Sequence, residues 1–216
     1  MAKSVLITGK PAHLASELVR AALGRGDRVV AATVADKPSE DGDEERMRRV
    51  AWNRPSPISA RSVVLEAINS FDTLDEAFIL YSPEGIYAPF HESPSSKAAA
   101  VMDEALKGSL FLVRELLSYF ERVRHGSLNI VIQDSGGEFH GPIDACARGG
   151  LESFANALFT YYQNEPVECR GFVSESEQVK EFAMHILNVI DEKGRRSSGK
   201  WHRYSGRGGL FSRTRQ

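Results

Sequence analysis

The sequence predicts an α/β fold with one doubly wound, mostly parallel sheet of seven strands and helices on both faces. Apolar runs rich in β-branched residues alternate along the chain with segments of helical periodicity. Such alternation is typical of parallel sheets built from strand–helix–strand units. Most of the apolar runs are continuous rather than alternating, which indicates strands that are covered on both faces.

The expected strands are separated by stretches long enough for a helical crossover, as parallel pairing requires. The last strand is the shortest of the seven. In chain order they are Ser4–Thr8, Arg28–Thr33, Arg49–Asn53, Ala77–Tyr81, Leu128–Asp134, Val167–Phe172 and Trp201–Tyr204.

The expected helices lie between these strands. The first, Pro11–Leu23, carries Leu14, Leu18 and Ala22 on one face and is followed by Gly24, a residue type that commonly ends helices. The others are expected at Ala60–Phe71, Ser95–Val123, Asp144–Tyr162 and Glu177–Ile190.

The composition is that of an ordinary globular protein. The chain has 216 residues, of which 42% are hydrophobic and 26% are charged, and its formal net charge is −2. This charge favours neither a nucleic acid nor a membrane as a partner. We expect one domain over residues 1–204, followed by a basic, flexible C-terminal tail at residues 205–216.

The sequence also predicts a compartment and the state of its thiols. No apolar run reaches the roughly 18 residues of a membrane span, and the N-terminus lacks the apolar region of a signal peptide, so we expect a cytoplasmic protein. The two cysteines, Cys146 and Cys169, are too few for a disulfide framework. Cys146 is expected in the core, and no histidine has ligand spacing to either thiol, so no metal site is expected.

The turn after the first strand is a candidate anion site. Helix N-termini bind phosphate through backbone N–H groups, and glycines let the phosphate approach closely. Here only Gly9 is a glycine, while Lys10 and His13 offer positive charge and Pro11 lacks an N–H group. The residues therefore leave open whether the turn binds a nucleotide or is a plain connection.

The order of these elements resembles the short-chain dehydrogenase/reductase family over nearly the whole chain. Thr8 and Gly9 match the family's Thr-Gly-x-x-x-Gly-x-Gly turn, but His13 and Ala15 stand in place of its second and third glycines. The resemblance implies a Rossmann-like fold and a cofactor, NAD or NADP. It implies cofactor binding by Thr8, Gly9, Lys10, His13, Leu14 and Asn53, with Asn53 in place of the Asp beside adenine.

The resemblance also assigns the catalytic positions. LNIVIQDSGG is similar to the family's fifth strand and places Ser135 on its catalytic serine. DACARGGLESFANAL is similar to the active-site helix, but Asp144 and Arg148 replace the Tyr and Lys of Tyr-x-x-x-Lys. Ala105, in the long helical segment Ser95–Val123, replaces the family's Asn.

These substitutions change the chemistry that the site can perform. The family's reaction needs a phenol whose pKa is lowered by a neighbouring lysine. A carboxyl group has an unperturbed pKa near 4, so an aspartate at this position cannot replace the phenol as proton donor unless it is strongly desolvated. Arg148 keeps the charge but not the shape of an ammonium group. At i, i+4 spacing we expect Asp144 and Arg148 to pair with each other.

The sequence leaves more than one function open. The loss of several motif residues with intact apolar faces favours a non-catalytic binding, regulatory or assembly protein. The alternative is an NAD(P)-dependent oxidoreductase with a non-standard site. A third possibility, nucleic-acid binding by the basic C-terminal stretch, rests on eight Lys or Arg and no acid from Lys193 onward, and we do not expect it.

Members of the family commonly form dimers and tetramers through two long helices, and the resemblance implies the same here. The corresponding segments are Ser95–Val123 and Asp144–Tyr162, so we expect a homodimer or homotetramer. The side chains expected at the contact are apolar: Phe111, Leu112, Leu116, Phe120, Phe154, Leu158 and Phe159.

Overall fold

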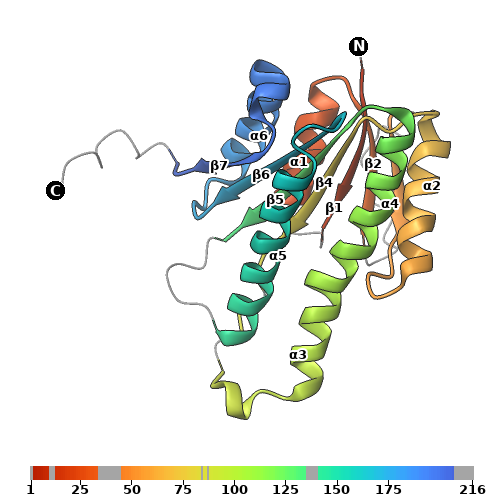
Figure 1. The fold of residues 1–216 in the computed structure, drawn as a ribbon. Coiled ribbons are helices and arrows are strands. Elements are labelled where there is room, and N and C mark those ends of the chain that lie inside the picture. The colour runs from red at the N-terminus through yellow and green to blue at the C-terminus, as the bar shows by residue number, and fades with distance from the viewer. Residues whose placement is uncertain are drawn as a thin grey trace, which may run out of the picture.

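The fold is seen in a computed structural model, which describes residues 2–9, 13–33, 45–83, 85–86, 88–134 and 141–206. The sheet has seven strands in the order β3-β2-β1-β4-β5-β6-β7, and each neighbouring pair is parallel (Figure 1). This confirms the predicted doubly wound sheet. The strands are β1 (Ser4–Thr8), β2 (Arg28–Thr33), β3 (Met47–Ala51), β4 (Glu76–Tyr81), β5 (Gly126–Gln133), β6 (Val167–Ser174) and β7 (Lys200–Tyr204).

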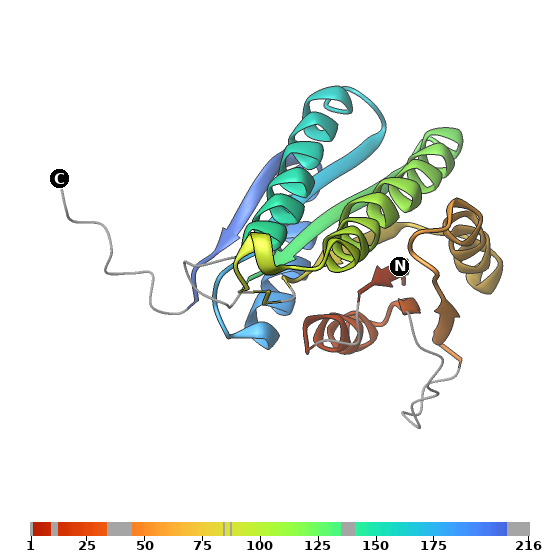
Figure 2. The same ribbon diagram turned by 90° about the horizontal axis from the view of Figure 1, so that it is seen from below.

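Helices cover both faces of the sheet, as the second view shows (Figure 2). The cluster of α1 and α6 packs on one face, and α2, α4 and α5 pack on the other, so each face has its own apolar core. The helices are α1 (His13–Gly24), α2 (Pro57–Phe71), α3 (Ser95–Met102), α4 (Gly108–Val123), α5 (Pro142–Tyr161) and α6 (Val179–Lys193).

The long helix expected at Ser95–Val123 is interrupted by a π-helical turn. This turn, Asp103–Lys107, separates α3 from α4, and the N–H of Gly108 donates to the carbonyl of Asp103. The wider turn adds a residue to the helix without ending it. Helical periodicity continues on both sides of such a turn, so the sequence pattern alone predicted one helix.

The third strand lies two residues earlier in the chain than predicted. It ends at Ala51 rather than Asn53, and the chain then turns into α2. The carbonyl of Asn53 accepts from the N–H of Ser56, and the hydroxyl of Ser56 caps α2 by accepting from the N–H of Ser59. Trp52 is 2% exposed and belongs to the core, which is why the run seemed to continue the strand.

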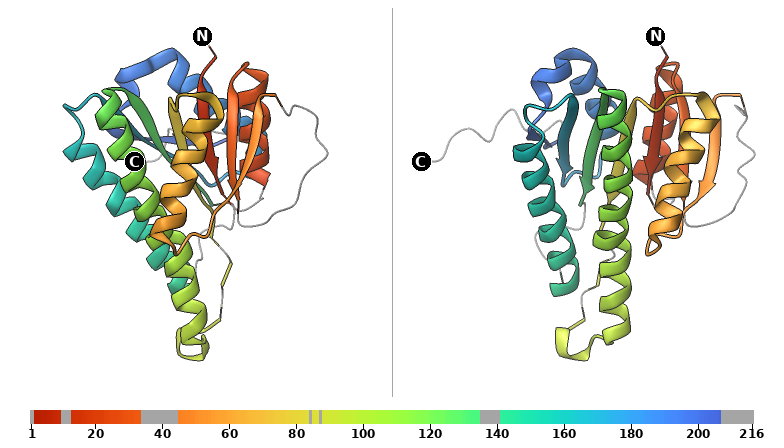
Figure 3. Two further views of the ribbon diagram at one scale, coloured as in Figure 1. Left: turned by 90° about the vertical axis from the view of Figure 1, so that its right-hand side faces the viewer. Right: turned by 45° about the vertical axis from the view of Figure 1, so that its right-hand side comes forward.

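The carboxyl and amino ends of the parallel strands are surrounded by different structures. At the carboxyl ends of the strands, α3 and the start of α5 extend beyond the sheet (Figures 1 and 3). The chain runs from β4 through Phe90–Glu92 into α3. β1 and β4 are neighbours there, whereas the chain leaves β1 toward β2 on the other side. This is the topological switch point at which ligands bind in doubly wound sheets.

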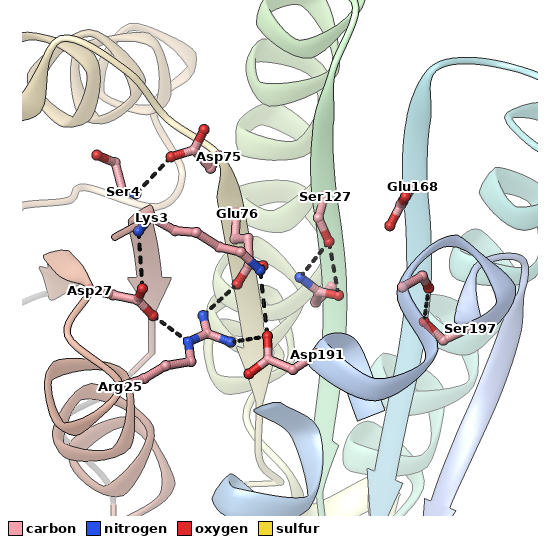
Figure 4. A network of polar contacts seen from close by, with 12 residues as sticks. Lys3, Ser4, Arg25, Asp27, Asp75, Glu76, Ser127, Glu168, Asp191 and Ser197 are labelled. Carbon is pink, nitrogen blue, oxygen red and sulfur yellow. Dashed lines mark hydrogen bonds and ion pairs between the residues drawn. The ribbon is translucent and has the colours of Figure 1, made fainter. Parts of the chain in front are cut away.

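An ion-pair network lies at the amino ends of β1 and β4 (Figure 4). The Arg25 guanidinium contacts Asp27 at 2.5 Å, Glu76 at 2.9 Å and Asp191 at 3.0 Å, and the Lys3 ammonium also binds Glu76. Burial alone would lower the pKa of Arg25, but the charges of Glu76 and Asp27 outweigh it and raise that pKa. The network joins the residue before β1, the connection between α1 and β2, the first residue of β4, and α6.

The helices expected at an oligomer contact bury most of their apolar side chains inside the chain. Five of the seven residues named for that contact are core residues, so that part of the prediction is wrong: Leu112, Leu116, Phe120, Leu158 and Phe159. Phe111 and Phe154 are partly buried. Within the described residues, no helix is long and apolar enough to cross a membrane.

Candidate functional site

A cavity of about 350 Å³ lies at the carboxyl ends of β1 and β4. Its position at the switch point and its volume are those of a small-molecule site, for which roughly 300–1,000 Å³ is usual. Its lining comes from the residue after β1, the start of α1, the connection from β3 to α2, the end of β4 with the residues after it, α3 and the π-helical turn: Gly9, Leu14, Ala15, Arg54, Leu80, Tyr81, Ser82, Pro83, Val101, Glu104 and Ala105.

The described part of the β1–α1 turn is packed tightly. Thr8 is fully buried, and its hydroxyl donates to the carbonyl of Phe78 at 3.1 Å, which ties β1 to β4. A Cβ added to Gly9 would lie 3.3 Å from the Ala15 Cβ and 3.5 Å from the Leu80 Cβ. Gly9 therefore keeps the floor of the cavity open, while the methyl group of Ala15 narrows it.

Apart from the buried Thr8, the predicted cofactor residues fall into three groups. Gly9 and Leu14 line the cavity. His13 and Asn53 are exposed and are absent from the described lining, and the backbone N–H of Asn53 donates to the Ser59 hydroxyl at 2.9 Å. Lys10 lies outside the described residues, as does the predicted catalytic Ser135.

Arg54 is a cavity residue that sequence reasoning missed. It is 6% exposed, its guanidinium carbon lies 4.7 Å from the centre of the Trp52 ring, and its Nη1 donates to the carbonyl of Glu104 at 3.3 Å. It also packs against α4, because a Cβ added to Gly108 would lie 2.8 Å from the Arg54 Cβ. The sequence signal was a cation two residues after a core tryptophan, at the carboxyl end of a strand.

Asp144 lies on the first turn of α5 and is 1% exposed. Its Oδ2 accepts a hydrogen bond from the backbone N–H of Ile86 at 2.9 Å, and its carbonyl accepts one from the Tyr81 hydroxyl at 3.3 Å. A carboxylate near a helix N-terminus is also favoured by the helix dipole. These contacts hold the loop after β4 against α5.

Arg148 lies one turn further along α5 and binds carboxylates from three other segments. It contacts Asp134 at the end of β5, Glu152 at 3.0 Å on its own helix and Glu175 at 3.5 Å after β6. Burial lowers its pKa, but the hydrogen bond to Glu152 and the charge of Asp134 outweigh burial and raise it. Arg148 therefore stays cationic and is held by these acids.

The expected pair between Asp144 and Arg148 is therefore wrong. The i, i+4 spacing permits this pair, but the Asp144 carboxylate accepts the N–H of Ile86 instead. Arg148 pairs with Glu152, which lies four residues after it on α5. Neither residue lines the cavity.

The two cysteine thiols differ in burial. Cys169 is buried, and burial raises the pKa of its thiol to about 12, with a further contribution from the charge of Glu121. Cys146 is exposed on α5, so its predicted place in the core is wrong. Within the part of the chain that the structure describes, no three His, Cys, Asp or Glu side chains group as a metal site would need.

Comparison with known proteins rests on structure. No family model matches the sequence, and no curated protein matches it. Solved structures match closely in fold. A candidate 3-oxoacyl-reductase from Bacillus thuringiensis superimposes with a TM-score of 0.80 at 14% identity, covering 96% of this chain and 98% of that one.

Two further solved structures are similar to this chain in fold. A short chain dehydrogenase from Mycobacterium smegmatis has a TM-score of 0.79 at 16% identity, covering 95% and 93% of the two chains. An oxidoreductase of the short chain dehydrogenase/reductase family from Brucella ovis, in complex with a partially ordered NAD, has a TM-score of 0.77 at 16% identity, covering 94% and 99%. The chain therefore has the fold of the short-chain dehydrogenases/reductases.

Proposed function

We propose that this chain is a non-catalytic binding, regulatory or assembly protein built on the short-chain dehydrogenase/reductase fold. The observation that carries the proposal is the surroundings of Arg148. Its guanidinium binds Asp134, Glu152 and Glu175. A group engaged in this way stabilises the junction of β5, α5 and the segment after β6, and it is poorly placed to lower the pKa of a proton donor or to hold a ribose.

The position of Asp144 supports the same proposal. In hydride transfer to a carbonyl, the residue at this place delivers a proton to the substrate oxygen. The Asp144 side chain is 1% exposed, and its Oδ2 accepts the N–H of Ile86, which gives it a structural contact within the chain.

An oxidoreductase with a non-standard site is the second candidate, and the cavity favours it. The cavity opens at the edge where doubly wound sheets bind dinucleotides, and Gly9 lies in its wall. The fit to NAD or NADP is partial, because Ala15 narrows the turn and the volume of about 350 Å³ is near the lower limit for ligand pockets. If a dinucleotide binds, it would supply the hydride, while Gly9 and Leu14 would contact it.

The first experiment is calorimetric titration with NADH and NADPH to millimolar concentration, followed by a search for NADH or NADPH oxidation with a panel of ketones and aldehydes. We expect no turnover. Turnover that is lost in Asp144→Asn or Ser135→Ala, but retained in Asp103→Asn, an acid-to-amide control outside the described cavity lining, would overturn the proposal and establish the oxidoreductase.

We also propose that the chain forms a homodimer or homotetramer through α4 and α5. The outer face of α5 carries small exposed residues at a spacing of four, Ala145, Gly149, Ser153 and Ala157. Residues at this spacing lie on one face, and small side chains let two helices approach closely. Leu110 on α4 and Tyr161 on α5 are exposed by 42% and 80% and add apolar area.

A further inference from the structure

We propose that the groove between α1 and α6 binds the anion of a fatty acid, with Lys180 contacting the carboxylate and Met184 and Leu187 contacting the acyl chain. The groove has a volume of about 430 Å³, which is within the range of small-molecule sites. It lies on the face of the sheet opposite α2, α4 and α5 (Figure 2), and it shares no described lining residue with the cavity at β1 and β4. The inference therefore goes beyond the proposed function.

The floor of the groove is apolar. Met184 and Leu187 lie three residues apart on α6, so they are on the same side of that helix, and they line the groove together with Ala21 of α1. A Cβ added to Gly24 would meet nothing within 4 Å, so the end of α1 leaves the groove open. The Met184 side chain is 47% exposed, and its flexible thioether can adapt to the shape of an acyl chain that covers it.

The rim of the groove carries one more cation than acids. Its charged residues are Glu17, Arg20, Arg25, Lys180 and Asp191. Glu17 pairs with Arg20, and Asp191 pairs with Arg25 at 3.0 Å, so both acids are compensated. Lys180 is exposed and makes no ion pair with any residue that the structure describes. The groove therefore offers this cation to a ligand with a single negative charge.

The cation and the apolar floor follow each other along one helix. Lys180, Met184 and Leu187 are spaced by four and three residues on α6, so they form a row on one side of it. The Arg25–Asp191 ion pair closes the other end of this row (Figure 4). Lys180 and Asp191 are eleven residues apart, which corresponds to about 16 Å along the helix axis. An extended acyl chain of medium length with a terminal carboxylate matches this order of groups.

The size of the apolar floor favours a small ligand over a protein partner. Stable protein interfaces bury about 800 Å² on each partner. The apolar side chains of the described groove lining are those of Ala21, Met184 and Leu187, which provide much less than this area. One acyl chain can cover a floor of this size, and the charge of Lys180 selects a chain with an anionic head.

The experiment measures binding to the full-length chain by calorimetry, below the micelle-forming concentration of each ligand. Octanoate and decanoate test the length of the acyl chain, and butyrate tests the carboxylate with a short chain. Decyltrimethylammonium has a chain as long as that of decanoate and the opposite charge.

Three full-length variants are compared with the wild type, and thermal unfolding shows that each of them folds. Lys180→Met removes the cation and keeps the length of the side chain. Met184→Glu places a negative charge on the floor of the groove. Lys200→Met is the matched control, because Lys200 is also exposed and has no ion pair among the described residues, but it lies on β7, outside the described groove lining.

We expect decanoate to bind more tightly than octanoate, and octanoate more tightly than butyrate, by about twofold to fourfold for each added CH₂ group. Met184→Glu should weaken decanoate binding by roughly tenfold or more, because it buries a charge under the chain and repels the carboxylate. Lys180→Met should weaken it by about threefold, as expected for an exposed ion pair, and should remove the dependence of the affinity on salt. Lys200→Met should bind as the wild type does.

The inference would be overturned by the absence of decanoate binding at millimolar concentration, or by equal affinities for decanoate and decyltrimethylammonium. Unchanged decanoate binding in folded Met184→Glu, or an unchanged salt dependence in folded Lys180→Met, would also overturn it. A wild-type oligomer that Met184→Glu converts to monomer would show that a second copy of the chain occupies the groove, and no fatty acid. Each of these results leaves the proposed non-catalytic function standing, because the oxidation of NADH or NADPH decides that proposal.

Discussion

At the scale of single residues, Asp144 and Arg148, the two positions that the family resemblance marks as catalytic, both make contacts within the protein. Asp144 accepts a backbone N–H from the loop after β4, and Arg148 joins β5 to the segment after β6. The contribution of these contacts to the free energy of unfolding can be measured separately from any activity.

Arg148→Met should destabilise the protein by about 3 kcal/mol, because it removes a charge partner from Asp134, which is 1% exposed. Urea unfolding measures this change. Arg203→Met is the control: Arg203 is 68% exposed and contacts Glu175 at 3.5 Å, so its loss should cost less than about 1 kcal/mol. Equal costs for the two variants would show that Arg148 is an ordinary surface residue.

The Cys169 thiol should be inert in the folded protein. Burial raises its pKa to about 12, so it stays a neutral thiol up to pH 9, and a thiol is far less nucleophilic than a thiolate. In a Cys146→Ser variant, maleimide should therefore label no thiol in the native state at pH 7 to 9 and one thiol in denaturant, as mass spectrometry can count. Rapid native labelling would mean that β6 opens readily.

At the scale of elements, close packing between neighbouring strands depends on Gly171. A Cβ on Gly171 would lie 2.3 Å from a ring carbon of Trp201 on β7. Trp201 in turn packs edge-on against Phe159 and donates to Asn156 Oδ1 at 2.8 Å, so the ring joins the last strand to α5. β7 is therefore held by a side chain that needs a glycine beneath it.

Gly171→Ala should destabilise the protein by about 2 kcal/mol through overpacking, and the fluorescence of Trp201 should shift as the ring moves. Denaturant unfolding and emission spectra test the two parts. Gly24→Ala at the end of α1 is the control, since a Cβ there meets nothing within 4 Å and should be neutral or stabilising by up to about 1 kcal/mol. An unchanged stability in Gly171→Ala would mean that Trp201 has another place to lie.

Most of the elements could be predicted from the sequence because their signals are local. β1 and β2 agree with the prediction to the residue, since continuous apolar runs end there at polar turns. The place of Arg54 could not be predicted, because it contacts the Glu104 carbonyl 50 residues further along the chain. The π-helical turn leaves the apolar periodicity on either side intact, so the sequence pattern did not reveal it. The cavity likewise forms only when β1, β3, β4 and the region after α3 come together.

The partners of Asp144 and Arg148 likewise could not be predicted from the sequence. Spacing along α5 correctly placed Asp144 and Arg148 one turn apart, but spacing cannot rank Glu152 above Asp144 as a partner for Arg148. That choice is made by Ile86, Asp134 and Glu175, which approach from other parts of the fold.

At the scale of the whole molecule, the proposed contact surface can be tested by charge. Ser153→Arg on the exposed face of α5 should convert the oligomer to monomer, measured by light scattering after size exclusion, because a buried unpaired charge is costly at an interface. Ser16→Arg, an exposed serine on α1, should leave the oligomer intact. A wild type that is monomeric at micromolar concentration would contradict the proposal.

The π-helical turn has a consequence for how this chain tolerates changes of length. A π turn is one residue more than an α-helix needs, so α3 and α4 are out of phase by about 100° relative to an unbroken helix. Deleting a single residue from Asp103–Lys107 would bring them into phase and rotate α3 about its axis relative to α4, which would move the core residue Val101 to another side of the helix. The deletion of one residue would therefore change which side chains of α3 line the cavity.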